Sequence, residues 1–494
     1  MIIGQGIDAQ MISDVTRLAE RRPKFIDVIL TPAEREVFDK RKGKHQMEFL
    51  AGRFSIKEAY SKAIGTGIGG DVHWHDLEIV PNESGQPVMV KHPKQDEAVA
   101  HISISHTGDT VHSSVILESL ASLHQPVSER RPAWLEISES ALAHNVAYIR
   151  ELTGAQRFFA VVKANAYGHG LPQIVKAAEK AGVDGFAVAT IDEGIWLRHF
   201  GIKKPIFILG VTPAEYVNDL ATFELMPVVA SEAWLDEALA LLPADKTLIA
   251  SVGVDTGMGR IGIRDRAELE RVVAKLNDTE NVEFKAIGMH FATADGGNTA
   301  YFEQQLQRWH ELTDGLDLPD DIWRHLANSG TSLWHKQPST DLVRVGAGMY
   351  GFDPSQGELA MREIQPVLSL KAELVHVKQV EAGASISYGA TYTTSEPEWI
   401  GTLPVGYADG YPRALQGMTA LLPDGREIEL IGRIAMDQLM VKLPEELPVG
   451  TVVTLIGSVD DKSITLVDLA NKMGTIPYEI ATGLSPRLPR KLVK

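Results

Sequence analysis

A single lysine interrupts an apolar segment in the first half of the chain. Lys163 lies in "FFAVVKANAYGHG" (158–170), where a glycine-containing polar loop follows the apolar residues. Burying an unpaired ammonium is costly, so a buried lysine tends to lose its proton. A neutral amine is a nucleophile toward carbonyl groups. The segment therefore predicts a lysine that forms an imine with a bound aldehyde or ketone.

Small and hydroxyl residues follow two later apolar segments. "ANSG" contains Ser329, and "VRVGAGMYG" contains Gly346 shortly after Arg344. If these segments are the seventh and eighth strands of a parallel barrel, the backbone amides that follow them can bind phosphate. An amine after the first strand and a phosphate site after the last two fit pyridoxal 5′-phosphate (PLP), which carries an aldehyde and a phosphate.

Arg344 bears on the reaction that such a cofactor supports. A carboxylate at the pyridine nitrogen protonates the ring and strengthens it as an electron sink. Arginine does not lose its proton, so an arginine there leaves the ring nitrogen unprotonated. A substrate carbanion is then less delocalised and regains its proton quickly. Arg344 therefore favours racemisation over transamination.

Two isolated carboxylates mark the N-terminal region. Asp8 ends "IIGQGID", and Glu58 lies in "AGRFSIKEAYSKAIGTG" between Lys57 and Lys62. Carboxylates with nearby lysines and a glycine-containing turn can hold Mg²⁺ against a pyrophosphate. The region therefore predicts a metal-dependent phosphate chemistry distinct from that of Lys163.

The composition sets limits on both chemistries. The chain has 494 residues and is 44% hydrophobic, which predicts two to four globular domains. A formal net charge of −17 argues against nucleic acid or an anionic membrane as a partner. The absence of cysteine excludes disulfides and thiolate catalysis. No stretch reaches the roughly 18 apolar residues of a membrane span, and we expect a cytoplasmic protein.

The polar segment "ESLASLHQPVSERRPAWLEI" (118–137) separates two unequal parts, and we place a linker at 123–131. In the part before it, residues 1–122, "TPAEREVFDKRK" begins with Thr31 as an N-cap, and "HQMEFLAGRFSIKEAYSKAIG" has helical periodicity. "DLEIVPNESGQPVMV" alternates on both sides of a turn and reads as a hairpin. The order predicts an α+β domain with helices on a small antiparallel sheet.

The part after the linker has a different pattern. Eight apolar segments alternate with helical ones, which is typical of parallel strands with covered faces. The count of eight predicts a (β/α)₈ TIM barrel over residues 132–360. Beyond about residue 360 the segments are strand-like with turns between them, so we expect an all-β domain over residues 361–494. The eight segments are "FFAVVK", "GFAVAT", "PIFILG", "LMPVVA", "LIASVGVD", "KAIGMHFA", "WRHLANS" and "LVRVGAGMY".

Residues 131–494 resemble bacterial alanine racemase. The resemblance implies PLP-dependent interconversion of L-alanine and D-alanine for peptidoglycan synthesis. It implies that Lys163 is the Schiff-base lysine and one catalytic base, and that Tyr388 of a second subunit is the other base, in a homodimer. The motifs that carry it are "AVVKANAYGHG", "DTGMGRIG", "HFATAD", "ANSG", "VRVGAGMYG", "SYGATY", "LPVGYADGYPR", "GRIAMDQ" and "GTIPYEI".

The same resemblance implies further roles. Arg344 would contact the pyridine nitrogen, and His290 would connect Arg344 to Tyr388. Arg260 and Met436 would contact the substrate carboxylate, and Tyr407 and Asp437 would line the access route. Cofactor and phosphate would be held by Tyr167, Ser329, Gly346 and Tyr478.

One position departs from the family pattern. Many members carry a lysine two residues before the aspartate of "DTGM", and this lysine is often carbamylated and positions the arginine. This chain has Gly253 there. Arg260 must therefore be oriented in another way.

Residues 1–118 resemble holo-[acyl-carrier-protein] synthase through "GID", "RFSIKEAYSKAIGTG" and "ISISHT". The resemblance implies transfer of 4′-phosphopantetheine from coenzyme A to a serine of acyl carrier protein. Asp8 and Glu58 would bind Mg²⁺, and the coenzyme A phosphates would be contacted by Arg53, Lys62 and His106. That family is usually trimeric, which implies a higher oligomer through this part.

Two alternatives remain open. The N-terminal part could be a docking module without catalytic activity. The barrel could be a PLP-dependent decarboxylase, although such enzymes usually have a carboxylate at the ring nitrogen and an active-site cysteine. This chain has Arg344 and no cysteine.

Overall fold

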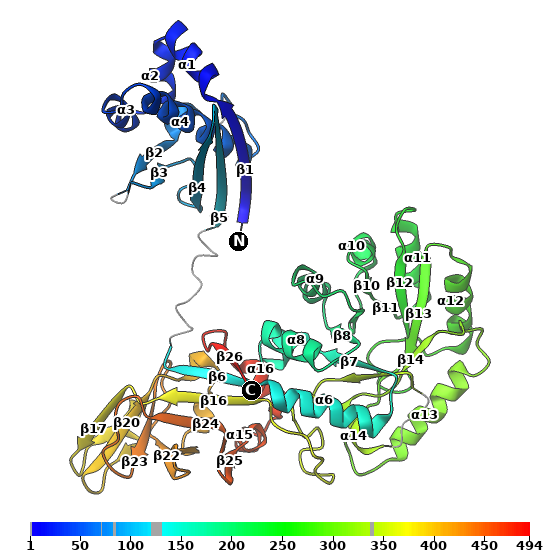
Figure 1. Ribbon diagram of the computed structural model, residues 1–494. Coiled ribbons are helices and arrows are strands. Elements are labelled where there is room, and N and C mark those ends of the chain that lie inside the picture. The colour runs from blue at the N-terminus through cyan, green and yellow to red at the C-terminus, as the bar shows by residue number, and fades with distance from the viewer. Residues whose placement is uncertain (1, 71, 83–84, 120–130, 336–339) are drawn as a thin grey trace. The chain divides into compact units, whose positions relative to one another are not determined.

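We describe the protein from a computed structural model that covers residues 2–70, 72–82, 85–119, 131–335 and 340–494. The chain forms two compact units, residues 1–127 and 128–494, and each is described by itself (Figure 1). The linker predicted at 123–131 lies, apart from Arg131, outside the described residues. Within the described ranges, no helix has both the length and the apolar character needed to cross a membrane.

The first unit packs helices on a three-stranded antiparallel sheet, as the sequence predicts. The strand order is β1-β5-β4, and β2 and β3 form the predicted hairpin beside it. Its strands are β1 (Ile2–Met11), β2 (Glu78–Pro81), β3 (Pro87–Lys91), β4 (Ala98–Thr107) and β5 (Thr110–Ser119). Its helices are α1 (Ile12–Arg21), α2 (Lys24–Ile29), α3 (Pro32–Asp39), α4 (Lys44–Ala63) and η1 (Trp74–Asp76).

Local sequence explains how these elements begin and pack. Thr31 caps α3 in a capping box with Glu34, as predicted. Glycines let β1 lie directly on α4. A Cβ on Gly6 would stand 2.0 Å from the carbonyl oxygen of Ala59, and one on Gly4 would stand 2.3 Å from that of Ala63. This close approach brings the end of β1 beside the second half of α4.

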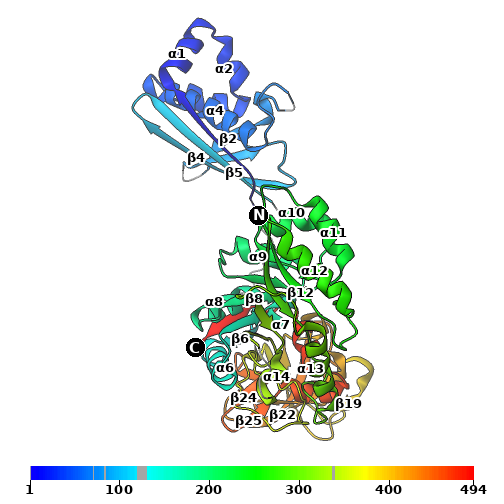
Figure 2. The same cartoon turned by 90° about the vertical axis from the view of Figure 1, so that its right-hand side faces the viewer.

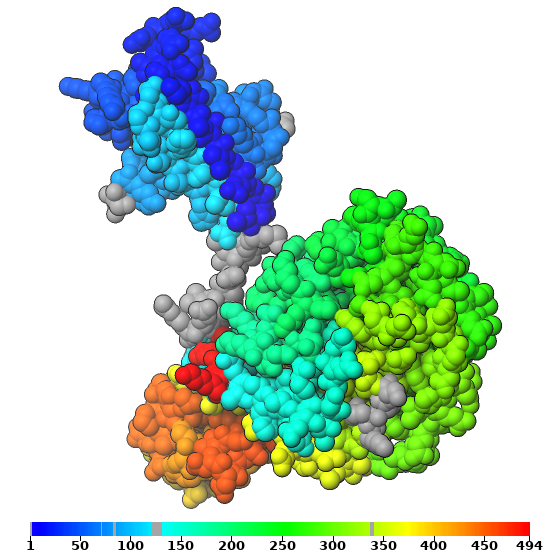
Figure 3. All heavy atoms as spheres, turned by 45° about the vertical axis from the view of Figure 1, so that its right-hand side comes forward, coloured from blue at the N-terminus to red at the C-terminus, as the bar shows by residue number. Residues whose placement is uncertain are grey.

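Strand β1 is an edge of the sheet and carries exposed apolar side chains. Ile2 is 63% exposed and Ile7 is 60% exposed. Figure 3 shows β1 as a dark blue strip along the surface of this unit, beside the lighter strands β4 and β5.

The second unit contains parallel strands at all eight predicted segments. They form two sheets, β10-β9-β8-β7-β15 and β11-β12-β13-β14. These strands are β7 (Arg157–Val161), β8 (Gly185–Val188), β9 (Ile206–Ile208), β10 (Leu225–Met226), β11 (Val228–Val229), β12 (Leu248–Gly253), β13 (Val282–Gly288), β14 (Trp323–His325) and β15 (Leu342–Val345).

The fourth segment is divided between the two sheets at Pro227. Proline has no N–H to donate to a ladder, so β10 ends before it and β11 begins after it. Its carbonyl oxygen still accepts a hydrogen bond from Ser251 N at 3.1 Å. On the other side, Arg344 N donates to the Ala327 carbonyl oxygen at 3.0 Å. These bonds link the two sheets.

Helices cover the outside of these strands (Figure 2). In α6, Leu142, Val146 and Ile149 are buried on one face, as their spacing predicts. The helices are α6 (Glu139–Thr153), α7 (Lys163–Tyr167), α8 (Leu171–Lys180), α9 (Ile191–His199), η3 (Ala214–Tyr216), α10 (Val217–Thr222), α11 (Glu232–Leu241), α12 (Arg266–Asp278), α13 (Ala300–Thr313) and α14 (Ser329–Trp334).

The C-terminal region is built on a large sheet with the order β17-β20-β23-β22-β21-β24-β16-β6-β26, and β25 pairs with β24. β6 (Ala133–Ser138), the first strand of the unit, pairs with β16 and with the last strand of the chain, β26 (Arg490–Val493). The other strands are β16 (Leu368–Glu373), β17 (His376–Val380), β18 (Ser385–Ile386), β19 (Tyr392–Thr393), β20 (Glu398–Leu403), β21 (Thr419–Leu421), β22 (Glu427–Ile431), β23 (Leu439–Leu443), β24 (Val452–Val459) and β25 (Lys462–Ile464).

The C-terminal region is β-rich, as expected, but it is not all-β. Besides short 3₁₀ turns at η4 (Tyr388–Ala390), η5 (Tyr407–Asp409) and η6 (Arg413–Leu415), the region contains α15 (Leu466–Met473) and α16 (Pro477–Gly483). Thr465 caps α15 in a capping box with Asp468, and Gly474 ends it in the left-handed conformation. These local signals lie between strands and are too short to stand out as a helical period.

Candidate functional site

Lys163 stands at the start of an unusual turn. The four residues that follow it, Ala164 to Tyr167, all have φ between 52° and 54°, the left-handed region. That conformation costs non-glycine residues about 1–2 kcal/mol each, so surrounding contacts must hold it. Asn165 Oδ1 accepts from Leu171 N at 2.8 Å, and Glu193 Oε1 accepts from Ala164 N at 2.7 Å. The turn places Tyr167 in the same cavity as Lys163.

The cavity has a volume of about 500 Å³ and lies in the second unit. Many of its lining residues come from the carboxyl ends of the parallel strands and the loops that follow them, the usual place for chemistry in barrels of this type. Eight residues predicted from the sequence line it together: Lys163, Tyr167, Arg260, His290, Ser329, Arg344, Gly346 and Tyr478.

The environment of Lys163 favours its neutral form. Burial lowers the pKa of this amine, and the nearby Arg260 cation lowers it further, while Glu193 raises it. Among the described residues, no hydrogen bond or ion pair engages the Lys163 Nζ atom. The amine is therefore available as a nucleophile or a base.

Arg344 is fixed by bonds on both sides of its guanidinium. Its Nη1 donates to His325 Nδ1 and to the His325 carbonyl oxygen. Its Nη2 donates to the Met289 carbonyl oxygen at 2.8 Å and to His290 Nδ1 at 3.3 Å. Burial lowers the pKa of Arg344 to about 10, which still leaves it charged at neutral pH. Burial and Arg344 together lower the pKa of His290 to about 3, so this imidazole is neutral.

Small residues and hydroxyls surround one end of the cavity. Ser329 Oγ accepts from Gly346 N at 3.1 Å and from Gly348 N at 3.3 Å. A Cβ on Gly346 would stand 2.5 Å from the Tyr167 hydroxyl oxygen. Burial raises the pKa of Tyr167 to about 12, which keeps the phenol protonated as a donor. Backbone amides, a serine and phenols suit a phosphate group.

Gly253 lines the cavity, and a side chain at this position would contact Val228 tightly. The nearest neighbour of a Cβ there would be Val228 Cγ2 at 3.3 Å. Arg260 belongs to the same cavity wall, and its charge bears on Lys163, His290 and Arg344.

The remaining racemase residues predicted from the sequence do not line this cavity. Tyr388 is 71% exposed, and Met436 is 53% exposed. Tyr407 N donates to the Ala435 carbonyl oxygen and Ala408 N donates to that of Met436, so these two loops lie together. Asp437 is exposed and forms an ion pair with Arg487 at 2.7 Å. The structure thus gathers these residues on the surface of the C-terminal region.

The first unit brings together three of its predicted residues. Lys62 Nζ donates to Asp8 Oδ1 at 2.8 Å. The second oxygen of Asp8, Oδ2, is buried and has no hydrogen-bond partner among the described residues. Burial raises the pKa of Glu58, and the charge of Asp8 raises it further. No group of three or more His, Cys, Asp or Glu able to hold a metal occurs in the described part of the chain, so a cation here would need ligands beyond this carboxylate pair.

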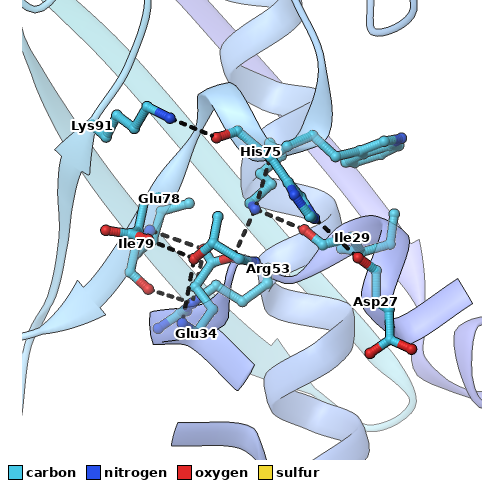
Figure 4. Close-up of polar contacts among 11 residues, drawn as sticks. Asp27, Ile29, Glu34, Arg53, His75, Glu78, Ile79 and Lys91 are labelled. Carbon is cyan, nitrogen blue, oxygen red and sulfur yellow. Dashed lines mark hydrogen bonds and ion pairs between the residues drawn. The ribbon is translucent and has the colours of Figure 1, made fainter. Parts of the chain in front are cut away.

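Arg53, predicted to contact coenzyme A, points into the domain interior. It is 5% exposed, and its Nε donates to the Ile79 carbonyl oxygen at 2.9 Å. Glu34 is the centre of this cluster (Figure 4): Oε1 accepts from Ile79 N at 2.9 Å and Oε2 accepts from Lys57 Nζ at 2.7 Å. Lys57 Nζ also donates to two carbonyl oxygens, those of Ile29 and Trp74. Arg53 and Lys57 on this face of α4 therefore stabilise the packing of neighbouring segments of the domain and are not free to bind a ligand.

His106, the other predicted coenzyme A contact, is exposed on β4. Asp8 pairs with Ser113 on β5, and Ser113 pairs with Ile104 on β4, two residues from His106. The two residues therefore lie on opposite edge strands of the sheet. Neither Arg53 nor His106 joins Asp8 within one chain, and their contacts with coenzyme A stay predictions.

Comparisons with known proteins find a family match for each of the two units. Residues 137–354 match the family "Alanine racemase, N-terminal domain", and residues 367–492 match "Alanine racemase, C-terminal domain". An alanine racemase of Ligilactobacillus salivarius is 48% identical over 359 residues, which cover 72% of this chain and 96% of that protein. The chain belongs to the alanine racemase family.

Residues 4–116 match the 4′-phosphopantetheinyl transferase superfamily. The protein is thus a phosphopantetheinyl transferase domain fused to the two domains of the alanine racemase family, as the motifs predict. The crystal structure of alanine racemase from E. faecalis is similar to this chain, with a TM-score of 0.71 and 42% sequence identity. The match covers 74% of this chain and 98% of the E. faecalis chain. A lysine racemase of Oenococcus oeni is 41% identical over 368 residues, covering 74% of this chain and 98% of that protein.

Sequence reasoning missed two residues of the racemase site. His325 and Ser251 are buried, and Ser251 Oγ lies 2.8 Å from His325 Nε2. The available signal was the serine within "LIASVGVD" and the histidine within "WRHLANS". Such a residue is more often a satisfied core side chain than part of a site.

Proposed function

We propose that the racemase unit interconverts L-alanine and D-alanine with PLP as its cofactor. The observation that supports this best is one cavity that holds Lys163, with its lowered pKa, together with Arg344 and Ser329. They offer an amine for an aldehyde, a fixed cation for a ring nitrogen and a hydroxyl for a phosphate. When bound, PLP would supply an electron sink for the negative charge left when a proton leaves Cα.

Three groups of residues would hold the cofactor. Lys163 would bind its aldehyde, and Arg344 would face its pyridine nitrogen. Arg344 has only donors and stays charged, so it would keep that nitrogen unprotonated and favour rapid return of a proton to Cα. The phosphate would contact Tyr167, Ser329, Gly346 and Tyr478.

Inversion at a carbon needs a proton donor or acceptor on each face. On one face, the Lys163 amine takes up or returns the proton, which its lowered pKa supports. On the other face we assign the Tyr388 phenol. Tyr388 is 71% exposed and does not line the cavity of its own chain. We therefore propose a homodimer in which Tyr388 serves the partner's cavity.

His290 connects the two halves of this proposal. Arg344 can only donate, so His290 Nδ1 accepts from it at 3.3 Å, while His290 Nε2 lies 3.4 Å from the amide nitrogen of Asn328. The Nε2 edge of this neutral ring would face an incoming Tyr388 side chain and connect it to Arg344.

The substrate assignment rests on the exposed cluster and Arg260. Arg260 and Met436 would contact the substrate carboxylate, and Tyr407 with Asp437 would narrow the access route, which suits a small side chain. A relative with 41% identity is a lysine racemase, so lysine is the competing substrate. Because the access route suits a small side chain, we propose alanine over lysine, and we propose that the D-alanine is used for peptidoglycan. The test is a direct competition between the two amino acids.

Purified protein loaded with PLP tests the reaction. We expect a visible absorbance band that is lost in Lys163→Ala, and deuterium uptake at Cα when L-alanine is incubated in D₂O. Release of carbon dioxide without exchange would favour the decarboxylase alternative. A colourless protein that inverts alanine without PLP would contradict the proposal.

We also propose that the two linked parallel sheets close into a (β/α)₈ barrel. Two features support closure: the shared segment at Pro227 and the bond between Arg344 N and the Ala327 carbonyl oxygen. The domain boundaries that we propose are 1–122, a linker at 123–131, a barrel at 132–360 and a C-terminal domain at 361–494.

For the first unit we propose Mg²⁺-dependent transfer of 4′-phosphopantetheine from coenzyme A to acyl carrier protein. The unpartnered Asp8 Oδ2 and the raised pKa of Glu58 mark two carboxylates that a cation would satisfy. Lys62 would contact the diphosphate. His106 lies on the opposite edge strand from Asp8, so an oligomer through this domain is part of the proposal. The cytoplasmic location stays a prediction.

Asp8→Ala separates this activity from the docking alternative. We expect it to abolish phosphopantetheine transfer and leave racemisation unchanged. Asp96→Ala, which removes an exposed carboxylate elsewhere in the same unit, is the matched control. Equal transfer by wild type and Asp8→Ala would remove the metal assignment, and no transfer by wild type would favour a docking module.

A further inference from the structure

Ser251 lies in the middle of β12, behind the cavity residues. Its side chain is fully buried, and its Oγ lies 2.8 Å from Nε2 of His325, which is 5% exposed. His325 comes from β14, so the contact crosses the neighbouring strand β13. A Cβ on Gly288, in that strand, would stand 2.1 Å from His325 Nδ1. The imidazole therefore has no room to rotate away on that side.

The donors around His325 decide which of its nitrogens carries the hydrogen. Arg344 Nη1 contacts Nδ1 and, as a guanidinium, can only donate. Nδ1 must therefore be bare. Burial and the charge of Arg344 hold the pKa of His325 well below its usual value, so the ring is neutral and keeps one hydrogen. That hydrogen is on Nε2, and Ser251 Oγ is the acceptor that faces it.

The alternative tautomer would be incompatible with this arrangement. A hydrogen on Nδ1 would point at a guanidinium N–H, and Nε2 would become an acceptor facing the serine hydroxyl. Without the hydroxyl, the Nε2–H would be buried with no partner, which is disfavoured. Arg344 therefore favours the Nε2–H tautomer, and the Ser251 hydroxyl stabilises it by accepting a hydrogen that would otherwise be buried without a partner.

We propose that Ser251 is a positioning residue for the racemase site. By accepting the Nε2–H of His325, it stabilises the tautomer whose Nδ1 receives Arg344, and so holds the guanidinium toward the cofactor's pyridine nitrogen. The proposal rests on the proposed PLP-dependent function for its consequence, but the tautomer itself is a property of the protein alone.

The first test needs no cofactor. Nitrogen-15 spectra of histidine-labelled protein, stripped of PLP, should show His325 as the Nε2–H tautomer in wild type, with the signal assigned by its loss in His325→Gln. In Ser251→Ala we expect that signal to broaden or to change to a mixture, and in Ser251→Thr to return. An Nδ1–H tautomer in wild type would overturn the proposal.

The second test measures the consequence for Arg344. We expect Ser251→Ala to bind PLP about 10-fold more weakly and to raise the ratio of pyruvate formation to racemisation about 10-fold. Pyruvate forms when the amino group of alanine stays on the cofactor, and one PLP is consumed for each pyruvate. Ser251→Thr should restore both values to within about threefold.

Ser332→Ala is the matched control, since Ser332 is about equally buried and its hydroxyl has no hydrogen-bond partner in the part of the chain that the structure describes. It should change neither value. If Ser251→Ala lowers racemisation and thermal stability but leaves the pyruvate ratio at the wild-type value, Ser251 is merely structural. A wild-type protein that binds no PLP would instead contradict the proposed function, while the tautomer measurement would still stand.

Discussion

The racemase cavity and the carboxylate pair of the transferase domain differ in how they are built to hold a ligand. In the cavity, burial shifts the pKa values of Lys163, Tyr167, His290 and Arg344. In the transferase domain, the Lys62 side chain is about half exposed. Asp8 Oδ2 has no hydrogen-bond partner among the described residues, and Gly6 of β1 lies directly against the Ala59 carbonyl of α4. An organic cofactor calls for an enclosed and dry site, whereas a hydrated cation with a diphosphate can be held at a surface.

Both sites share one property. Within one chain, each gathers only part of the residues that the sequence predicts: Tyr388 lies outside the cavity, and His106 lies across the sheet from Asp8.

The largest effect concerns sharing. Lys163→Ala and Tyr388→Phe should each lower racemisation about 10³-fold, because each removes one of two bases. Equal amounts of the two variants, allowed to exchange subunits, should regain about a quarter of wild-type activity, since half of the dimers are mixed and each has one intact site. The measurement is racemisation before and after exchange. No recovery would place both bases in one chain.

The next effect concerns positioning in the transferase domain. Gly6→Ala puts a Cβ 2.0 Å from the Ala59 carbonyl oxygen, so β1 must move off α4. We expect a loss of about 3 kcal/mol in the free energy of unfolding of this domain, with loss of phosphopantetheine transfer. Gly70→Ala is the control, since open space surrounds that position. Denaturant unfolding measures both, and equal stabilities would show that the strand adjusts at little cost.

A smaller effect concerns tuning in the racemase cavity. Arg260→Gln removes the second-largest cause of the lowered pKa of Lys163, so that pKa should rise while burial still holds it below its usual value. The neutral amine then appears only at higher pH. We expect the midpoint of PLP binding to stripped protein to move to higher pH. Arg264→Gln, at an exposed arginine nearby, should leave it in place. A midpoint that moves to lower pH would contradict the assignment.

The smallest effect concerns the turn after Lys163. Ala164 is exposed with φ of 53°, which glycine adopts freely. Ala164→Gly should therefore stabilise the racemase unit by about 1 kcal/mol. Ala143→Gly, at an exposed position inside the right-handed helix α6, should destabilise it by about 1 kcal/mol. Thermal unfolding of the two variants gives the signs, and a shift of the same sign in both would refute the strain.

The sequence predicted most of the elements because apolar segments and caps are local signals. All eight segments that were predicted to form a barrel contain a strand, and the cap at Thr31 is present. The division at Pro227 could have been anticipated from its missing N–H. The left-handed turn could not, since alanine and tyrosine have no preference for it and only tertiary contacts hold it.

The site was predictable where chemistry is tied to one residue type, as at Lys163 and Arg344. It was not predictable where a role depends on a neighbour across a strand. Ser251 and His325 lie 74 residues apart and meet only because their strands flank β13. Arg53 is the opposite case: the motif predicted a ligand contact, and the fold places its guanidinium against Ile79.

The pairing of β6 with β26 has a consequence for biosynthesis. The strand that opens the racemase unit, β6, needs Arg490–Val493 as a neighbour, and those residues are synthesised after all the parallel strands that lie between the two. The transferase domain can complete its sheet while translation continues, because all of its strands precede residue 120. The racemase unit cannot complete its large sheet before β26 has been synthesised, so it finishes folding later than the transferase domain that precedes it.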